Sequence, residues 1–234
     1  MEPAPITFVY PFNGQCALNF DYDGKEYRVC WAGDWRRPPD LSRFPHTTNF
    51  NVRELPHSED EKEVWASSKV IAYGADSHVR EFLDPCDFPL CKIAIDHRQR
   101  QLLQKEFDIL CHLSSCGAPV VHTCTEPLLD ENGMFGFKMQ RLQNIEYRNL
   151  AVLKIELEEA IKQVHGAGII HGDISPSNIL QNSHGRITLI DFGRAGVLGE
   201  HVSQEHMRFR EQHFENYTKT MDYEKMEQTI GMTP

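Results

Sequence analysis

The sequence predicts an α+β fold in which short strands accompany two long helices. Segments 16–32 and 69–95 show the alternating or continuous apolar patterns of strands, broken by turn residues such as Asp23-Gly24. Segments 98–117 and 146–168 instead place apolar residues at helical spacing, and each ends in a glycine that can terminate a helix. The chain has 234 residues, which allows one domain or two small lobes.

The remaining elements follow in chain order. Residues 6–10 and 16–32 predict two or three antiparallel strands. The proline-rich and charged segment 33–67 predicts a long surface connection that ends in a short helix near Glu59–Ser67. Segments 120–142 and 169–193 fit further short strands and loops, and the tail 204–228 is polar and helical in pattern.

Composition restricts the function classes. The formal net charge is −10 with scattered Lys and Arg, so we expect no nucleic-acid partner. No apolar run reaches the roughly 18 residues of a membrane helix, and the N-terminus lacks a signal-peptide pattern, so we expect a cytoplasmic protein without membrane contact. The seven cysteines are expected to be reduced thiols. The Cys and His residues between 111 and 124 lack a paired C-x-x-C spacing, which disfavours zinc.

Two short motifs carry chemistry. "HGDISPSN" occupies residues 171–178, and "DFG" follows at 191–193. Phosphoryl transfer needs oxygen ligands for Mg²⁺ and a carboxylate that orients or deprotonates the attacking hydroxyl. Asp173, Asn178 and Asp191 offer that set in two loops. Taken singly, Asp173 could instead form a turn and Asn178 cap a helix, but that reading leaves their joint spacing unexplained.

This spacing matches H-x-D-x-x-x-x-N and D-F-G, and the chain therefore resembles the protein-kinase-like superfamily over roughly residues 69–196. Its HGD loop is similar to the compact atypical branch that includes aminoglycoside and choline phosphotransferases, RIO-type kinases and the kinase of the KEOPS complex. The resemblance implies a two-lobed fold, with a β-rich N-lobe at 69–142 and a short helical C-lobe at 143–234. Residues 1–68 would form an N-terminal β-hairpin extension that could cover the nucleotide lobe, line the substrate site or form a homodimer.

The resemblance also implies roles for single residues. Asp173 would be the catalytic base, with Asn178 and Asp191 as Mg²⁺ ligands. His171 would shape the loop by packing, and Phe192 would pack under the helix that carries the glutamate. The other implied residues serve ATP: Lys92 for the α and β phosphates, Glu106 as its ion-pair partner, Gly74 and Ser77 in the phosphate loop, and Met139, Gln140 and Leu142 in the strand and hinge that bind adenine. Without the two loops, the usual exposure of charged residues would make Lys92 a snorkelling edge-strand lysine and Glu106 a solvated helix residue.

The sequence departs from ordinary protein kinases in several places. Gly172 replaces the arginine that answers activation-loop phosphorylation, and Ser175 replaces a lysine that stabilises the transferring phosphoryl group. The loop at Gly74 has a single glycine, its Asp76 would repel a triphosphate, and no A-P-E element follows Gly193.

Three hypotheses follow from these features. The first is an ATP- and Mg²⁺-dependent phosphotransferase that acts on a hydroxyl of a small molecule or a protein. The second is a pseudokinase or scaffold without turnover. The third is a kinase-like fold used for non-phosphoryl chemistry on a metabolite.

Overall fold

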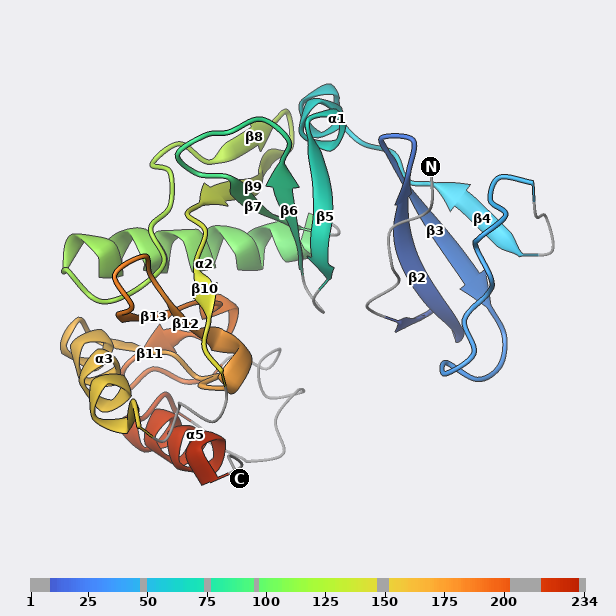
Figure 1. Cartoon of the computed structure of the whole chain (residues 1–234). Coiled ribbons are helices and arrows are strands. Elements are labelled where there is room, and N and C mark those ends of the chain that lie inside the picture. The colour runs from blue at the N-terminus through green and yellow to red at the C-terminus, as the bar shows by residue number, and fades with distance from the viewer. Residues whose placement is uncertain are drawn as a thin grey trace. The chain divides into compact units, whose positions relative to one another are not determined.

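The computed structural model describes residues 9–46, 50–73, 77–94, 97–146, 152–202 and 216–231. The chain forms two compact units (Figure 1). The first consists of Met1–Gln101 and Glu126–Lys138, and the second of Leu102–Thr125 and Met139–Pro234. Helix α2 (His97–Ser115) and strand β9 (Gly133–Met139) each begin in the first unit and end in the second.

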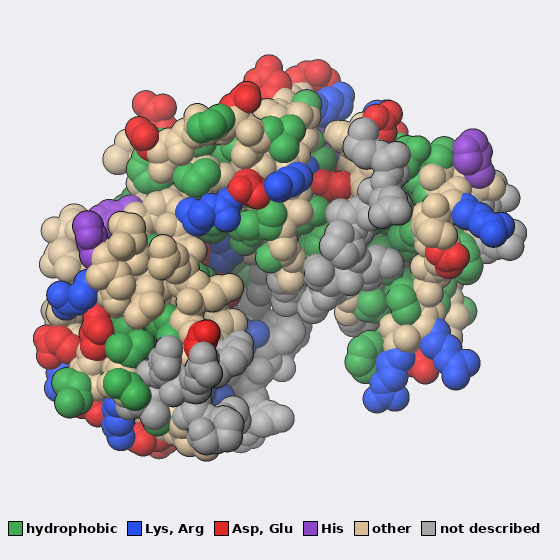
Figure 2. All heavy atoms as spheres, in the orientation of Figure 1, with side chains coloured by type: hydrophobic (Ala, Val, Ile, Leu, Met, Phe, Trp, Pro, Cys, Tyr) green, Lys and Arg blue, Asp and Glu red, His purple; other side chains and the backbone are tan. Residues whose placement is uncertain are grey.

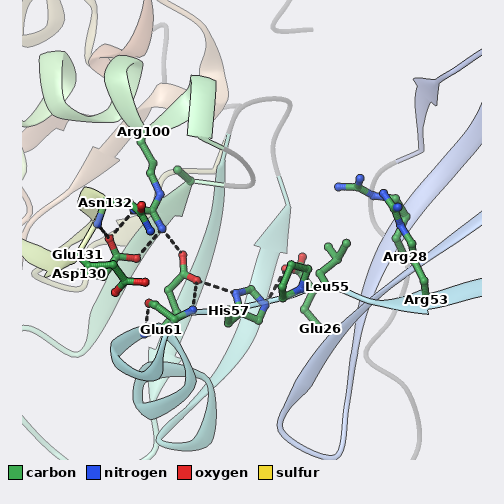
Figure 3. Close-up of a pocket in the computed structure, with 13 residues that line it drawn as sticks. Glu26, Arg28, Arg53, Leu55, His57, Glu61, Arg100, Asp130, Glu131 and Asn132 are labelled. Atoms are coloured by element: carbon green, nitrogen blue, oxygen red, sulfur yellow. Dashed lines mark hydrogen bonds and ion pairs between the residues drawn. The ribbon is translucent and has the colours of Figure 1, made fainter.

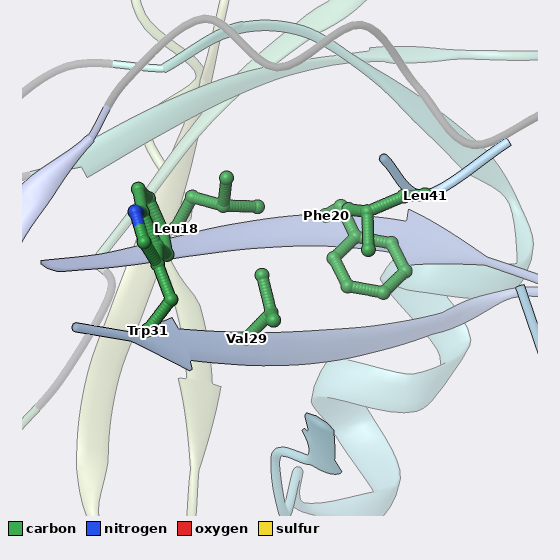
Figure 4. Packing of buried hydrophobic residues seen from close by; sticks show 5 residues of the cluster. All are labelled: Leu18, Phe20, Val29, Trp31 and Leu41. Carbon is green, nitrogen blue, oxygen red and sulfur yellow. The ribbon is translucent and has the colours of Figure 1, made fainter. Parts of the chain in front are cut away.

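The first unit begins with a four-stranded antiparallel sheet, in the order β1 (Tyr10–Phe12), β2 (Gln15–Tyr22), β3 (Lys25–Trp31) and β4 (Asn51–Glu54). The turn between β2 and β3 lies at Asp23 and Gly24, which both have positive φ, as a tight hairpin turn requires. Alternate residues of these strands form an apolar cluster on one face (Figure 4): Leu18, Phe20, Val29 and Trp31, with Leu41 from the following loop.

A second sheet of the first unit has five strands, in the order β5 (Ser68–Tyr73), β6 (Ser77–Phe82), β7 (Leu90–Ala94), β9 and β8 (Leu128–Asp130). Helix α1 (Glu59–Ala66) precedes it. Ser58 and Glu61 form a capping box at the start of α1, which satisfies backbone N–H groups that the helix leaves unpaired. Val64 and Trp65 of α1 then pack in the apolar cluster of this sheet.

A chain of charged side chains connects the two sheets of the first unit (Figure 3). His57 Nε2 lies 3.2 Å from Glu26 Oε2, and His57 Nδ1 lies 3.0 Å from Glu61 Oε2. Arg100 in turn donates to Glu61 at 2.7 Å and to both carboxylate oxygens of Asp130 at 2.7 and 2.8 Å. These alternating charges compensate one another where water is largely excluded, and they link β3 to α1 and to the β8–β9 turn.

Two histidines near this chain have pKa values shifted in opposite directions. Burial by itself would lower the pKa of His57, but its bonds to Glu26 and Glu61 outweigh burial and raise the pKa to about 9. His78 is 1% exposed and packs between the rings of Trp65 and Tyr73. Its burial lowers the pKa to about 4. The folded protein therefore holds a charged His57 and a neutral His78 near neutral pH.

These shifts predict a maximum of stability near pH 6.5. The raised pKa of His57 contributes stability that is complete below its unfolded pKa of about 6.5 and is lost as the pH rises through about 9. The lowered pKa of His78 contributes stability above about pH 6.5 that is lost as the pH falls toward about 4. On each side of this maximum, which we call the alkaline limb and the acid limb, the free energy of unfolding is expected to fall by roughly 2–3 kcal/mol.

Urea unfolding at pH values from 4 to 9.5 measures both limbs. His57→Gln is expected to remove the alkaline limb and to keep the acid one. A free energy of unfolding that stays flat between pH 6.5 and 9 in the unaltered protein would contradict the charged state of His57.

Among the residues that the structure describes, the second unit contains two small sheets, the α-helices α3 and α5, and the C-terminal part of α2. One sheet has the order β10 (Gln143–Asn144), β12 (Ile179–Gln181) and β13 (Ile187–Leu189), and the other pairs β11 (Ile169–Ile170) with β14 (Gly196–Val197). Helices α3 (Lys154–Gly166) and α5 (Lys219–Gly231) lie side by side (Figure 1). Gly196 leaves room for the ring of Tyr217, which a Cβ at that position would overlap. Tyr217 belongs to a buried cluster with Ile170, Val202 and Met221.

The surface carries charges of both signs. On the face seen in Figure 2, basic and acidic side chains are interspersed between apolar ones. None of the helices in the described part of the chain is long and apolar enough to cross a membrane.

The α+β prediction is confirmed, but two segments differ from the sequence pattern. Segment 33–67 contains strand β4, whose place is set by the edge of β3 rather than by its own pattern. Segment 120–124 forms isolated bridges, Val120 with Leu189 and Thr123 with Met139, in place of a strand. The boundaries proposed at 68/69 and 142/143 stay predictions, since the compact units group residues 102–125 with the C-terminal part of the chain.

Candidate functional site

The two motifs form adjacent loops in the second unit. "HGDISPSN" follows β11 and ends in a 3₁₀ turn, η2 (Pro176–Asn178), and "DFG" follows β13 with a second 3₁₀ turn, η3 (Phe192–Arg194). A backbone hydrogen bond of 3.1 Å from Ile190 N to Asn178 O joins the loops. The small sheet of β12 and β13, which pair along their length, carries this connection. Two stretches thirteen residues apart are thereby fixed beside each other.

Asn178 is held within the first loop. Its Nδ2 donates to the backbone oxygen of Asp173 at 2.9 Å, and the side chain is buried. This bond uses the nitrogen of the amide and directs its Oδ1 as an acceptor. Asp173 itself is partly exposed, as its expected role as catalytic base requires.

Asp191 begins the second loop in an unusual backbone conformation. Its φ of 62° and ψ of 67° lie in the left-handed region, which residues with a Cβ adopt at an energetic cost. Such strain is concentrated at functional sites, where the surrounding structure enforces it. The Asp191 side chain is exposed.

His171 ties the two loops together. Its Nδ1 accepts a hydrogen bond from Asp173 N at 3.2 Å, and its Nε2 lies 2.9 Å from the backbone oxygen of Ile190. These partners assign the proton to Nε2, because a carbonyl oxygen can only accept. The imidazole also packs on Phe192, with ring centroids 4.4 Å apart.

Glu106 lies beside the second loop. It is 3% exposed on the part of α2 that belongs to the second unit, and its Oε1 accepts a hydrogen bond from Phe192 N at 3.2 Å. A Cβ added to Gly193 would lie 3.6 Å from Glu106 Oε2 and 3.5 Å from Asp191 Oδ1. The structure therefore brings Glu106 together with Asp173, Asn178 and Asp191 in one unit, joined through the two loops.

Asp222 is a residue of this site that the sequence motifs do not reveal. It lies on α5, is fully buried, and its Oδ1 accepts from Gly172 N at 2.7 Å. Its Oδ2 accepts from His171 N at 2.9 Å and lies 2.8 Å from His165 Nε2. Gly172 has a φ of 77°, so the loop turns sharply over this carboxylate. Asp222 thus holds the backbone of the loop that carries Asp173.

One sequence signal could have identified Asp222. The buried residues of α5 are Met221, Asp222, Met226 and Thr229, which follow helical spacing. An aspartate within the inward stripe of a helix requires buried hydrogen-bond donors as partners. Thr229, on the same stripe, donates to the backbone oxygen of Ile174 at 3.2 Å and so supports the same loop.

A cation also lies near Asp173. Arg194 Nη1 is 3.9 Å from Asp173 Oδ2, and both side chains are about one third exposed. Ser175, which stands where many kinases have lysine, has its Oγ 2.9 Å from Ser177 Oγ. The DFG loop therefore places a positive charge beside Asp173.

The residues expected to bind the phosphates belong to the first unit. Lys92 lies on β7 opposite Val79 of β6 and is 8% exposed, and Ser77 is buried at the start of β6. Gly74 and Asp76 lie outside the described residues. Glu106 belongs to the second unit, so the ion pair of Lys92 with Glu106 stays a prediction.

The residues expected to bind adenine lie at the start of the C-terminal part of the second unit. Met139 forms an antiparallel bridge with Thr123, and Gln140 N donates to His122 O at 3.0 Å. Gln140 lines a cavity of about 650 Å³ with residues of α3 and of the β12–β13 turn. Leu142 follows, partly buried. The N–H of Gln140 is thus used within the protein.

The oxygen atoms of the two loops fit a hard divalent cation. Within the described ranges, no three His, Cys, Asp or Glu side chains are grouped to hold a metal ion. A site built on the Asn178 amide and the Asp191 carboxylate alone suits Mg²⁺, which takes few protein ligands and completes its shell with water and phosphate oxygens.

Known protein kinases are similar to the part of the chain that carries both loops. Residues 126–224 match the protein kinase domain, which is less than half of the chain and includes both loops and Asp222. Over 70 residues, 29% of this chain, the sequence is 36% identical to the chloroplastic serine/threonine-protein kinase STN8 of Arabidopsis thaliana, of which this covers 14%. Over 49 residues, 21% of this chain, it is 45% identical to human 3-phosphoinositide-dependent protein kinase 1, of which this covers 9%.

A third relative aligns over a longer segment. The probable serine/threonine-protein kinase glkA of Dictyostelium discoideum is 28% identical over 121 residues, which cover 47% of this chain and 26% of that protein. The chain thus spans about a quarter or less of the length of these relatives. Together the similarities support a relation of this chain to the protein-kinase-like superfamily, and they support a phosphotransferase of the kinase type.

Proposed function

We propose that this chain, whose residues 126–224 match the protein kinase domain, is an ATP- and Mg²⁺-dependent phosphotransferase. The observation that carries the proposal is the joining of two loops through Asn178. Its Nδ2 donates to Asp173 O and its backbone oxygen accepts from Ile190 N, so the candidate base and both candidate metal ligands share one rigid connection. Such prior positioning accounts for much of the catalysis of phosphoryl transfer.

Each group of the site then has a task. Asp173 orients the acceptor hydroxyl and takes its proton as the oxygen bonds to the γ-phosphorus and the bond to ADP breaks. Asn178 Oδ1 and the Asp191 carboxylate would hold Mg²⁺, which when bound would neutralise charge on the phosphate oxygens. Lys92 would contact the α and β phosphates, with Glu106 as its expected ion-pair partner. Arg194 adds positive charge near Asp173, where Ser175 supplies none.

Further features of the proposal concern the acceptor and the setting. Gly172 in the HGD loop favours the compact atypical branch, whose acceptors are small molecules or proteins. The net charge of −10 and the scattered Lys and Arg residues favour a protein that does not bind nucleic acid. The N-terminal sheet of β1–β4 is a candidate homodimer contact.

Calorimetric titration with ATP in the presence and absence of Mg²⁺ tests the proposal, together with transfer of labelled γ-phosphate to water or to a panel of hydroxyl acceptors. Binding is expected only with Mg²⁺, and Asp191→Asn is expected to weaken it by at least about tenfold, because a charged metal ligand is lost. Glu200→Gln, an exposed carboxylate of the same unit, is the matched control.

Two results decide between the alternatives. Mg·ATP binding without any transfer, including to water or to the protein itself, would favour the scaffold hypothesis. Absence of binding in a well-folded sample would reject the proposed function.

A further inference from the structure

The N-terminal sheet has a polar face opposite its apolar cluster. Its side chains alternate along the strands with the apolar ones, and register pairs place Asn19 beside Arg28, and Asp21 beside Glu26. Asn19, Glu26 and Arg28 are buried and Asp21 is partly buried. The polar face of an antiparallel sheet is more commonly exposed to water. This face therefore has a partner in the same unit.

Asp21 connects the polar face to the five-stranded sheet. Its Oδ2 lies 2.7 Å from Nη1 of Arg80, which stands on β6 and is 1% exposed. Arg80 also donates to Ser68 Oγ at 2.8 Å and to Ser68 O at 3.3 Å, and its guanidinium lies 4.3 Å from the ring centroid of Trp65. The charge of Arg80 is thus removed from water and compensated by a carboxylate of the N-terminal sheet.

The same carboxylate contacts the neighbouring strand. The hydroxyl of Tyr73, the last residue of β5, donates to Asp21 Oδ1 at 3.4 Å. Tyr73 pairs with His78 at the start of β6, so Asp21 touches both strands of one hairpin. Ser77, the first residue of β6 and the neighbour of His78, is one of the residues expected to meet the ATP phosphates.

This ion pair is not a source of large net stability. Burial raises the pKa of Asp21 above its ordinary value even though Arg80 lowers it. A buried pair of this kind contributes little stability beyond an apolar contact of the same shape, and in some proteins it is retained because it specifies one arrangement. Two oxygens directed at two adjacent strands fit such a positioning role.

We propose that the N-terminal sheet fixes the β5–β6 strand pair for nucleotide binding, with Asp21 as the positioning residue. This inference rests on the proposed function, because it assigns Ser77, at the start of β6, to the ATP phosphates. It also gives residues 1–68 a role, which the match to residues 126–224 does not.

The test compares Asp21→Asn with Asp23→Asn. Both variants remove one carboxylate from the same hairpin, but Asp23 is exposed at the turn and its positive φ suits asparagine. We expect Asp21→Asn to raise the dissociation constant and the KM for Mg·ATP about tenfold, a size typical of coupling between linked sites, while kcat changes little. Asp23→Asn is expected to leave both values unchanged.

Hydrogen exchange supplies a readout that needs no nucleotide. Amides of β5 and β6 are expected to exchange faster in Asp21→Asn than in Asp23→Asn, with unchanged exchange in α5. If Asp21→Asn does not fold, Tyr73→Phe removes the second contact and leaves Arg80 paired, and a smaller shift in the same direction is expected.

The outcomes are distinguishable. A lower melting temperature with unchanged KM and unchanged exchange in β5 and β6 would show that Asp21 is only structural and would overturn the inference. If the unaltered protein does not bind Mg·ATP, the proposed function fails. Exchange in the two strands then decides whether Asp21 positions them: equal exchange in the two variants overturns that role, and faster exchange in Asp21→Asn supports it.

Discussion

Replacement of Asp173 by asparagine is expected to lower kcat for phosphoryl transfer by about 10³-fold, within the range that general acid–base catalysis contributes. Asparagine keeps the size of the side chain but cannot accept the proton of the acceptor hydroxyl. The fold around position 173 should persist, because Asn178 and His171 bind the backbone of Asp173 and not its carboxylate.

Single-turnover transfer of γ-phosphate, measured beside Mg·ATP affinity, separates the two effects. Affinity is expected to stay within about threefold, since Asp173 is assigned to the acceptor and not to the nucleotide. Ser183→Ala, in the exposed turn between β12 and β13 of the same unit, is the matched control. Transfer at an undiminished rate in Asp173→Asn would remove Asp173 from the catalytic step.

Asp222→Asn is expected to destabilise the protein by about 3–5 kcal/mol, because it breaks a buried charged network. The carboxylate accepts from two backbone N–H groups and contacts His165, using both oxygens. An amide presents one oxygen and one NH₂ group, so at least one buried N–H would face another donor. The loop that carries Asp173 would lose its support together with this stability.

Guanidinium unfolding and kcat, measured on the folded fraction, test this expectation together. Glu224→Gln changes an exposed carboxylate two residues along the same helix and should alter neither value. A variant that loses stability but transfers phosphate at the normal rate would show that Asp222 supports the fold without positioning Asp173.

Local signals in the sequence accounted for several elements. The turn of the first hairpin lies at Asp23-Gly24, where two residues with positive φ are needed, and α2 ends at Ser115 just before Gly117, whose φ is also positive. The capping box of Ser58 and Glu61 starts α1 within the segment expected to be helical. These features depend on neighbouring residues, so a linear pattern is enough to predict them.

Strand β4 and segment 120–124 depended on distant partners. Asn51–Glu54 has no strong strand pattern and is ordered by the edge of β3, whereas 120–124 has an apolar pattern but makes only isolated bridges. Strand formation reflects the neighbours available in space more than intrinsic preference.

The candidate site also has a part that the sequence predicts and a part that only the folded structure reveals. The sequence by itself predicts which residues would carry the proposed chemistry, Asp173, Asn178 and Asp191, because phosphoryl transfer requires those side chains at a defined spacing. Only the tertiary structure decided what holds them: Asp222 under the loop, Glu106 on Phe192 N, and Arg194 beside Asp173. The reason is physical. A motif is a local pattern, whereas the buried Asp222 carboxylate accepts a hydrogen bond from Gly172 N, 50 residues away in the sequence. Only the packing of the folded chain brings these two groups together.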